Sequence, residues 1–251
     1  MKQGRMSELH LQVLAGLANR LRAMVSGICM AEELGLKLVV HWSVDHACGS
    51  TFDALFDAES LPPFVTVTHF PLLKAYMCLS TEDMEHVKKV WDRQKPLVLK
   101  SYGHFHRSDM PRWIQYFRIL KPRHELEQKI EERLPPFDQS RFLGVHIRRG
   151  DNEKSIQGSP LEAFIQRMDT EDAFFVVASD DDTIRMFLKR RFPGRVWFPA
   201  RLLERGSEEG MKEAVIDFFS LARCPRILGS VSSSFSELAA LYGNSTLELA
   251  T

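Results

Sequence analysis

Residues 142–151 read Phe-Leu-Gly-Val-His-Ile-Arg-Arg-Gly-Asp. The first six residues of this stretch are mostly apolar and have the pattern of a buried strand. Arg148, Arg149 and Asp151 follow where the strand ends, and Gly150 allows a tight turn there. Ligands of open α/β sheets bind just outside the carboxyl ends of strands, so this turn is predicted to be a binding site.

The two adjacent arginines of this turn need an anion as partner. The planar guanidinium of arginine suits a phosphate group, and each charge-assisted hydrogen bond contributes roughly 1.5–3 kcal/mol. The alternative is a surface turn in which Asp151 pairs with one of the arginines. The hydrophobic strand before the turn, with His146 inside it, favours the binding site.

The chain has 251 residues, which is enough for one large domain or two small ones. Its 33 basic and 33 acidic side chains give a net charge of zero, which argues against a nucleic-acid partner because such proteins need a basic surface. Any anion binding must therefore be local. The four cysteines form no Cys-x-x-Cys pair, so neither a zinc site nor a redox dithiol is indicated. Cys29 and Cys224 are expected in the core.

Neither a membrane span nor a secretory signal is expected. No run of about 18 apolar residues occurs, and no apolar segment follows the early positive charges. We therefore expect a cytoplasmic protein, with a chain from which an anchor has been removed as the alternative. Nothing in the residue pattern indicates an oligomeric state.

Strand and helix patterns alternate along the chain and predict an α/β fold with mostly parallel, doubly wound sheets. The expected strands are residues 7–14, 37–42, 64–70, 96–102, 142–148, 173–179, 195–198, 226–229 and 246–249. The expected helices are residues 15–34, 81–91, 112–120, 123–134, 160–168, 182–192, 208–222 and 234–242. Pro135 and Pro136 follow a charged helix and mark the best boundary, so we expect domains at residues 1–135 and 136–251.

The first strand leads through Gly16, Asn19 and Arg20 into a helix. A helix N-terminus after a strand favours anions, so Asn19 could cap this helix and Arg20 could contact a phosphate. The spacing is neither a dinucleotide fingerprint nor a Walker loop. The segment alone favours the other interpretation, a plain turn with an ordinary helix cap.

A second buried strand ends in Ser179-Asp180-Asp181-Asp182, where a helix begins. Asp180 is expected at the same edge of the sheet as Arg148. Three roles stay open for these aspartates: a helix cap, recognition of a guanine by hydrogen bonds, or a divalent-metal site, in that order of preference.

A third strand runs into Ser-Val-Ser-Ser-Ser-Phe-Ser-Glu at residues 230–237, where the last helix begins. Hydroxyls and free N–H groups at a helix N-terminus make a phosphate cradle. Ser234 with Glu237 also fits a capping box, and both roles can hold at once. A nucleoside diphosphate would explain all three strand ends.

These motifs resemble those of the inverting fucosyltransferase superfamily, which includes α1,2-, α1,6- and protein O-fucosyltransferases and bacterial nodulation enzymes. His146-Ile147-Arg148-Arg149-Gly150-Asp151 resembles its first motif, His-x-Arg-Arg-Gly-Asp. Residues 178–181 and 232–239 resemble its second and third motifs, and residues 16–20 are similar to its N-terminal Gly-x-x-Asn-Arg/Gln turn.

The resemblance implies a GT-B-like architecture, in which two Rossmann-like domains face a cleft. Residues 1–135 would form the acceptor side, and residues 136–251 would bind the donor GDP-fucose. No metal and no further cofactor are implied. The implied donor-binding residues are Gly16, Asn19, Arg20, His146, Arg148, Asp180, Ser232, Ser233, Ser234 and Phe235.

Among these residues, the resemblance implies that Arg148 binds the β-phosphate and that His146 and Asp180 contact the guanosine. Ser234 and Phe235 would line the phosphate and the base. Asn19 and Arg20 would reach the diphosphate or the fucose.

The expected activity is that of an inverting, metal-independent glycosyltransferase that moves fucose from GDP-fucose to a hydroxyl of a glycan or glycolipid-linked saccharide. Arg148, Arg149 and Asp151 are the expected catalytic residues. The general base stays open among Asp151, Glu8, Asp45 and His41. The alternatives are a transferase for another nucleotide sugar and a non-catalytic GDP-sugar-binding protein.

Overall fold

The computed structural model describes residues 7–92, 94–106, 109–150 and 152–251. The chain divides into two compact units, the first ending at Arg123 and the second beginning at His124. The domain division expected from the prolines lies further along the chain, after residue 135. The difference is helix α5 (His124–Arg133), which contacts α9 (Glu208–Leu221) of the second unit and pairs there through Arg133 and Glu213, 2.5 Å apart.

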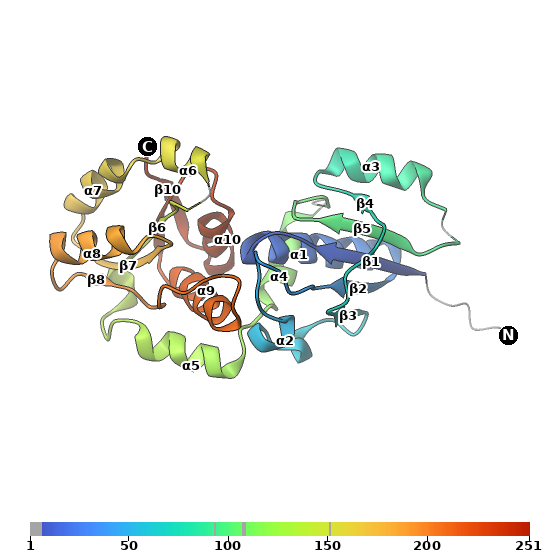
Figure 1. The fold of residues 1–251 in the computed structure, drawn as a ribbon, viewed down its shortest axis with the longest axis horizontal. Coiled ribbons are helices and arrows are strands. Elements are labelled where there is room, and N and C mark those ends of the chain that lie inside the picture. Colours follow the sequence, from blue (N-terminus) through green and yellow to red (C-terminus); the bar gives the residue numbers. More distant parts are fainter. Residues whose placement is uncertain (1–6, 93, 107–108, 151) are drawn as a thin grey trace. The chain divides into compact units, whose positions relative to one another are not determined.

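The first unit is built on a parallel sheet with the strand order β3-β2-β1-β5-β4 (Figure 1). Its strands are β1 (Glu8–Val13), β2 (Lys37–His41), β3 (Val65–Thr68), β4 (Tyr76–Met77) and β5 (Leu97–Ser101). Its helices are α1 (Leu17–Leu34), α2 (Phe52–Leu55), η1 (Ala58–Ser60), α3 (Thr81–Val90) and α4 (Met110–Arg118).

Helix α1 packs closely on β1 because Gly27 has no side chain. A Cβ at Gly27 would lie 2.5 Å from a methyl carbon of Leu11. The helix ends at Gly35, whose φ of 64° is left-handed and suits glycine. The predicted end of this helix at residue 34 is confirmed.

The second unit is built on another parallel sheet, with the order β10-β9-β6-β7-β8. Its strands are β6 (Phe142–Ile147), β7 (Phe174–Ser179), β8 (Val196–Trp197), β9 (Arg226–Gly229) and β10 (Thr246–Leu249). The further helices are η2 (Gln139–Arg141), α6 (Glu153–Gly158), α7 (Leu161–Asp169), α8 (Asp182–Arg191) and α10 (Ser234–Gly243).

Strand β6 is central, and every one of its residues is buried. Val145 and Ile147 belong to a core cluster that also contains Phe164 of α7 and Leu188 of α8. On the other face, a Cβ at Gly144 would lie 3.1 Å from a methyl carbon of Leu221, so α9 lies close to the strand there. Helices therefore cover both faces of this sheet, as predicted for a doubly wound fold.

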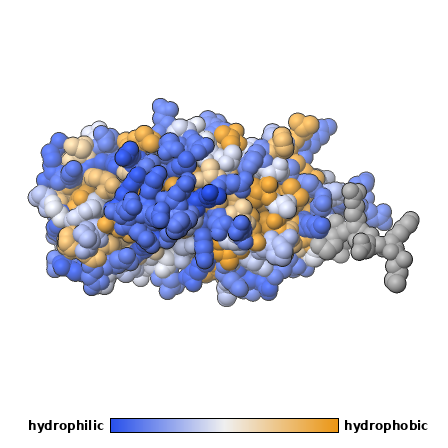
Figure 2. All heavy atoms as spheres, turned by 90° about the horizontal axis from the view of Figure 1, so that it is seen from below, coloured by the Kyte–Doolittle hydropathy of each residue, from blue (hydrophilic) through white to orange (hydrophobic). Residues whose placement is uncertain are grey.

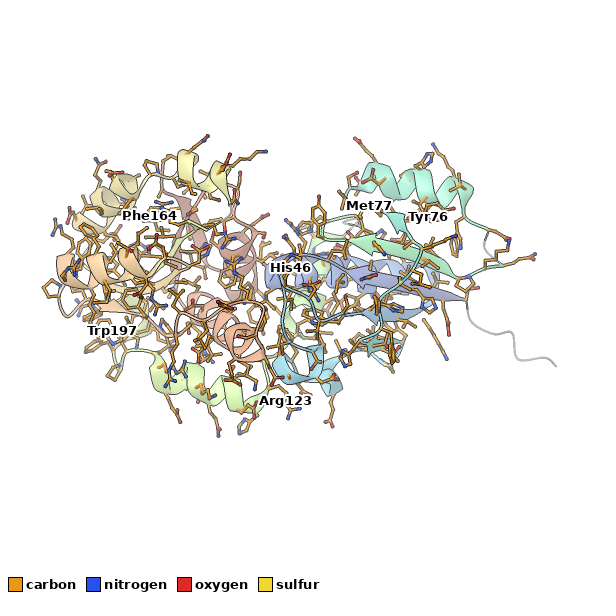
Figure 3. All side chains as sticks on the ribbon, viewed as in Figure 1. His46, Tyr76, Met77, Arg123, Phe164 and Trp197 are labelled. Atoms are coloured by element: carbon orange, nitrogen blue, oxygen red, sulfur yellow. The ribbon has the colours of Figure 1, made fainter. Side chains whose placement is uncertain are left out.

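The nine predicted strands and eight predicted helices correspond to elements of the structure, with ends shifted by a few residues. The short elements β4, α2 and α6 were not predicted; Figure 3 labels Tyr76 and Met77 of β4. Cys29 and Cys224 are buried, as expected. Among the described residues, no helix has the length and apolarity needed to cross a membrane. Figure 2 shows mainly hydrophilic residues on one face, with apolar ones between them.

Candidate anion-binding site

The ends of three neighbouring strands form the candidate site. In the second sheet, β6 lies between β7 and β9, and the register pairs Ile147 with Ser179 and His146 with Gly229. Arg148, Asp180 and Ser230 therefore emerge together at the carboxyl edge. The later strands of this unit lie on both sides of β6, so the site is at the topological switch point where α/β sheets bind ligands.

Asp180 is the centre of the site. Its carboxylate accepts hydrogen bonds from the N–H groups of Arg149 (2.8 Å) and Gly150 (3.1 Å) and from the guanidinium of Arg148. A Cβ at Gly150 would lie 2.8 Å from the carboxylate oxygen Oδ2. The glycine is thus needed for this close approach, in addition to the predicted tight turn.

Arg205, in the loop before α9, also contacts Asp180, with 3.4 Å between Nη2 and Oδ2. Burial alone would raise the pKa of Asp180. Arg148, the N–H groups of Arg149 and Gly150, and Arg205 outweigh burial and hold that pKa below its usual value. Asp180 is therefore an anion that holds the guanidinium groups of Arg148 and Arg205, and the contact with the guanosine that the resemblance implies stays a prediction.

The side chain of Arg149 turns away from the carboxylate of Asp180. Its Nη1 donates to the Arg148 carbonyl (3.0 Å), and its Nη2 donates to the Ser159 carbonyl (3.0 Å). The guanidinium carbon also lies 6.0 Å from the ring centre of Phe164. The guanidinium groups of Arg148 and Arg149 therefore have different partners. That of Arg148 pairs with Asp180, whereas that of Arg149 holds the turn against the segment before α7.

His146 links the turn to the third motif. Its Nδ1 lies 3.3 Å from the Ser233 hydroxyl, and its ring stacks on Phe235 with 4.9 Å between centres. Burial lowers the pKa of His146 to about 3, so the ring is neutral at physiological pH. The Ser230 hydroxyl fixes this strand end by donating to the His146 carbonyl (3.3 Å) and accepting from the Arg148 N–H (3.0 Å).

The loop after β9 is held firmly. Ser232 has a left-handed φ of 55°, and its carbonyl accepts a hydrogen bond from Asn152 at 3.1 Å. Val231 is bonded through its N–H to Ser159 (2.8 Å) and through its carbonyl to Ser155 (2.7 Å). Such strained backbone persists where the surrounding contacts determine it.

Helix α10 begins directly after this loop. The capping box suggested for Ser234 is not formed: the N-cap residue is Ser233, and it makes no side-chain cap hydrogen bond. The first-turn N–H groups of α10 are therefore not capped by the Ser233 hydroxyl. At the start of α8, by contrast, Asp181 caps the helix by accepting from the N–H groups of Thr183 (2.8 Å) and Ile184 (3.2 Å), as expected for one of the three aspartates.

The predicted site residues of the first unit are engaged within that unit. The left-handed φ of 65° falls on Ala15, while Gly16 is the N-cap of α1 in an extended conformation. Asn19 is not the cap; its side chain accepts from Arg22.

Arg20 has no exposed surface, since its relative exposure is 0%. Its nitrogens donate to the carbonyls of Ala15 (2.8 Å) and Ser43 (2.5 Å) and to the carboxylate of Asp45 (2.6 Å). In the structure, Arg20 therefore holds the loops that contain Ala15, Ser43 and Asp45, and its contact with the donor stays a prediction.

The general-base candidates are also engaged. Asp45 pairs with Arg20, and Asp151 lies outside the described residues. Glu8 and His41 belong to a chain of contacts through His10: Glu8 to His10 is 3.2 Å, His10 to His41 is 3.0 Å, and His41 to the Phe70 carbonyl is 2.7 Å. Within the described part of the chain, no group of three or more His, Cys, Asp or Glu residues could hold a metal.

Two residues of the site were not predicted. Ser230 belongs to the third motif region but received no role, because its bonds depend on the register of β9 against β6. Arg205 lies in a loop without a motif, so no sequence signal could connect it with Asp180.

Comparison of the sequence with family models and with curated proteins finds no match. The fold, however, has solved counterparts. NodZ α-1,6-fucosyltransferase soaked with GDP-fucose has a TM-score of 0.68 at 18% identity over 95% of this chain and 93% of that one. A structure of fucosyltransferase NodZ from Bradyrhizobium has a TM-score of 0.66 at the same 18% identity, over 94% and 93% of the two chains.

Two further enzymes share the fold. An Arabidopsis thaliana FUT1 mutant in complex with GDP has a TM-score of 0.67 at 11% identity, over 99% of this chain and 71% of that one. POFUT1 in complex with GDP has a TM-score of 0.58 at 11% identity, over 97% and 98%. The predicted α/β fold of GT-B type and the resemblance to fucosyltransferase structures are thereby confirmed at the level of the fold.

Proposed function

We propose that this protein is a glycosyltransferase that transfers fucose from GDP-fucose to a hydroxyl of a glycan or glycolipid-linked saccharide, with inversion and without a metal. The observation that carries the proposal is the meeting of Arg148, His146 and Phe235 at the switch point of the second sheet. Structures of the same fold hold GDP or were soaked with GDP-fucose.

The charge of the site suits the leaving group of such a reaction. When the acceptor hydroxyl attacks the anomeric carbon, GDP leaves with growing negative charge on its β-phosphate. Arg148 is partly buried and held in place by Asp180, so it is a preorganised cation. Fixed cations that face developing charge stabilise the transition state more than the ground state.

The remainder of the site suits the nucleotide. The neutral ring of His146 stacks on Phe235, and this aromatic pair lies beside the hydroxyl of Ser233. Beside it begins α10, whose N-terminus favours a phosphate. We assign the diphosphate to Arg148 and the start of α10, with Ser232 and Ser234 as further contacts of the donor.

The direct test incubates the protein with GDP-fucose and a panel of glycan and glycolipid-linked acceptors, and detects fucosylated product by mass spectrometry. Product is expected with and without EDTA, and NMR of the new linkage should show the inverted anomeric configuration. Absence of transfer with every acceptor, despite GDP binding, would favour a non-catalytic GDP-sugar-binding protein. Transfer only from GDP-mannose or UDP-glucose would favour another nucleotide sugar.

A further inference from the structure

Arg205 lies at the edge of the candidate site, outside every sequence motif. Its guanidinium contacts Oδ2 of Asp180 at 3.4 Å, and its side chain is 46% exposed. The same oxygen accepts from Arg148, whose side chain is only 12% exposed, and from the N–H of Gly150 at 3.1 Å. Of these three donors, Arg205 makes the longest contact, and its side chain is more exposed than that of Arg148.

Arg205 and Arg148 are like charges near one carboxylate. Burial and the charge of Arg205 both lower the pKa of Arg148, so the two guanidinium groups repel each other. An anion placed between them would relieve this repulsion and would accept hydrogen bonds from both.

The loop that carries Arg205 is fixed on its N-terminal side by hydrogen bonds to polar side chains. Arg133 donates to the Pro199 carbonyl (3.1 Å), and Arg185 donates to the Ala200 carbonyl (2.7 Å). Glu213 of α9 accepts from the N–H of Arg201 at 2.7 Å.

The residue next to Arg205 is fixed as well. The carbonyl of Glu204 accepts from the Ser207 hydroxyl at 2.8 Å, and a Cβ at Gly210 would lie 1.9 Å from that carbonyl oxygen. Since α9 begins against this loop only because residue 210 is a glycine, the fold presents Arg205 at a defined position.

We propose that Arg205 is a second diphosphate-binding arginine. When the donor binds, Arg205 leaves Asp180 and contacts the β-phosphate, while Arg148 keeps its contact with Asp180. This inference rests on the proposed function. It assigns Arg205 to the charged part of the nucleotide, so guanosine without phosphate should not depend on it.

The test measures binding of GDP, GMP and guanosine by isothermal titration calorimetry. Arg205→Ala should weaken GDP binding about tenfold to a hundredfold, weaken GMP binding less, and leave guanosine binding unchanged. Arg205→Lys should recover only part of the loss, because a point charge does not replace the planar guanidinium. Arg190→Ala, on the exposed side of α8, is the matched control for loss of one positive charge.

The outcomes separate this inference from the proposed function. If the unmodified protein binds no GDP, the proposed function fails and Arg205 loses its assigned ligand. If it binds GDP and Arg205→Ala binds equally well, only the present inference is overturned. Equal weakening for GDP, GMP and guanosine would also overturn it, because that pattern indicates a structural role. Thermal unfolding checks that each variant folds, and Arg205→Gln replaces the alanine variant if that one does not.

Discussion

Asp180 determines what the neighbouring arginines can do. A carboxylate that accepts from Arg148 and from two backbone N–H groups fixes the guanidinium before any ligand arrives. The adjacent Arg149 instead bonds to carbonyl oxygens of the turn. Neighbours in sequence therefore have different roles, and we expect them to respond differently to substitution.

Replacement of Arg148 by alanine should lower turnover of fucosyl transfer by about 10²–10³, the loss measured when one transition-state donor is removed. Arg148→Lys should also be poor, since lysine cannot form two parallel hydrogen bonds. Steady-state kinetics with GDP-fucose checks both variants, and Arg190→Ala is the control. Near-normal turnover in a folded Arg148→Ala variant would contradict the assigned role.

His146 should make the stability of the protein depend on pH. In the folded protein its pKa is about 3, below the ordinary value of 6.5. Between pH 3 and pH 6.5, the imidazole is therefore protonated in the unfolded chain but neutral in the folded protein. The stability contribution is complete above about pH 6.5 and is lost as the pH falls toward 3, with a slope of up to about 1.4 kcal/mol per pH unit.

Urea unfolding of His146→Phe between pH 4 and pH 6 tests this slope. Phenylalanine keeps an aromatic ring against Phe235 and has no titrating group, so the variant should show a flatter pH dependence. His124→Phe, at an exposed position, is the control and should keep the original slope. An unchanged slope in the His146 variant would mean that its burial does not exclude the proton.

At the level of elements, most strands and helices were predictable, including the two-residue β8, but the short β4 and α2 were not. Strands β6, β7 and β9 consist mainly of apolar residues, and βα alternation predicts that they run parallel. Strand β4 has two residues and α2 has four, which is too short for a periodic signal. The bonds of Arg20, Ser230 and Arg205 depend on register and loop course, which no local pattern specifies.

Helix α9 holds the loop before it through two carboxylates one turn apart. Glu213 accepts from Arg133 and from the N–H of Arg201, and Asp217 accepts from the N–H of Ala200. Burial raises the pKa of Asp217 to about 7, although Arg185 lowers it in part. The folded protein thus binds a proton here that the unfolded chain releases above about pH 4.

Asp217→Asn should therefore stabilise the protein at pH 8. The stability associated with the raised pKa is complete below about pH 4 and is lost as the pH rises through about 7. Asparagine remains uncharged and can still accept from the Ala200 N–H, so the variant avoids the penalty of a buried charge. Chemical denaturation at pH 5 and pH 8 should show a larger gain at pH 8; an equal gain at both would contradict the assignment.

At the level of the molecule, the fold alone does not establish the activity, because one architecture serves many reactions. The case for fucosyl transfer comes from the side chains at the switch point of the second sheet.

Hydrogen exchange with and without GDP can locate the nucleotide in the whole chain. Protection should increase at residues 146–150, 199–207 and 230–236, where the site groups lie. Protection at residues 15–20 would support the predicted donor contacts of the first unit. UDP and NAD serve as controls and should increase protection in none of these four segments. A response confined to other segments would contradict the proposed site.

The backbone N–H groups of the turn at residues 148–150 are already hydrogen-bonded within the protein. The N–H of Arg148 donates to Ser230, and those of Arg149 and Gly150 donate to Asp180. A Walker loop encloses phosphate with main-chain amides, whereas this turn can offer an incoming oxyanion only side-chain charge. Main-chain amides for the diphosphate must therefore come from the start of α10, and the part of the binding that Arg148 supplies should weaken as sulfate or ionic strength rises.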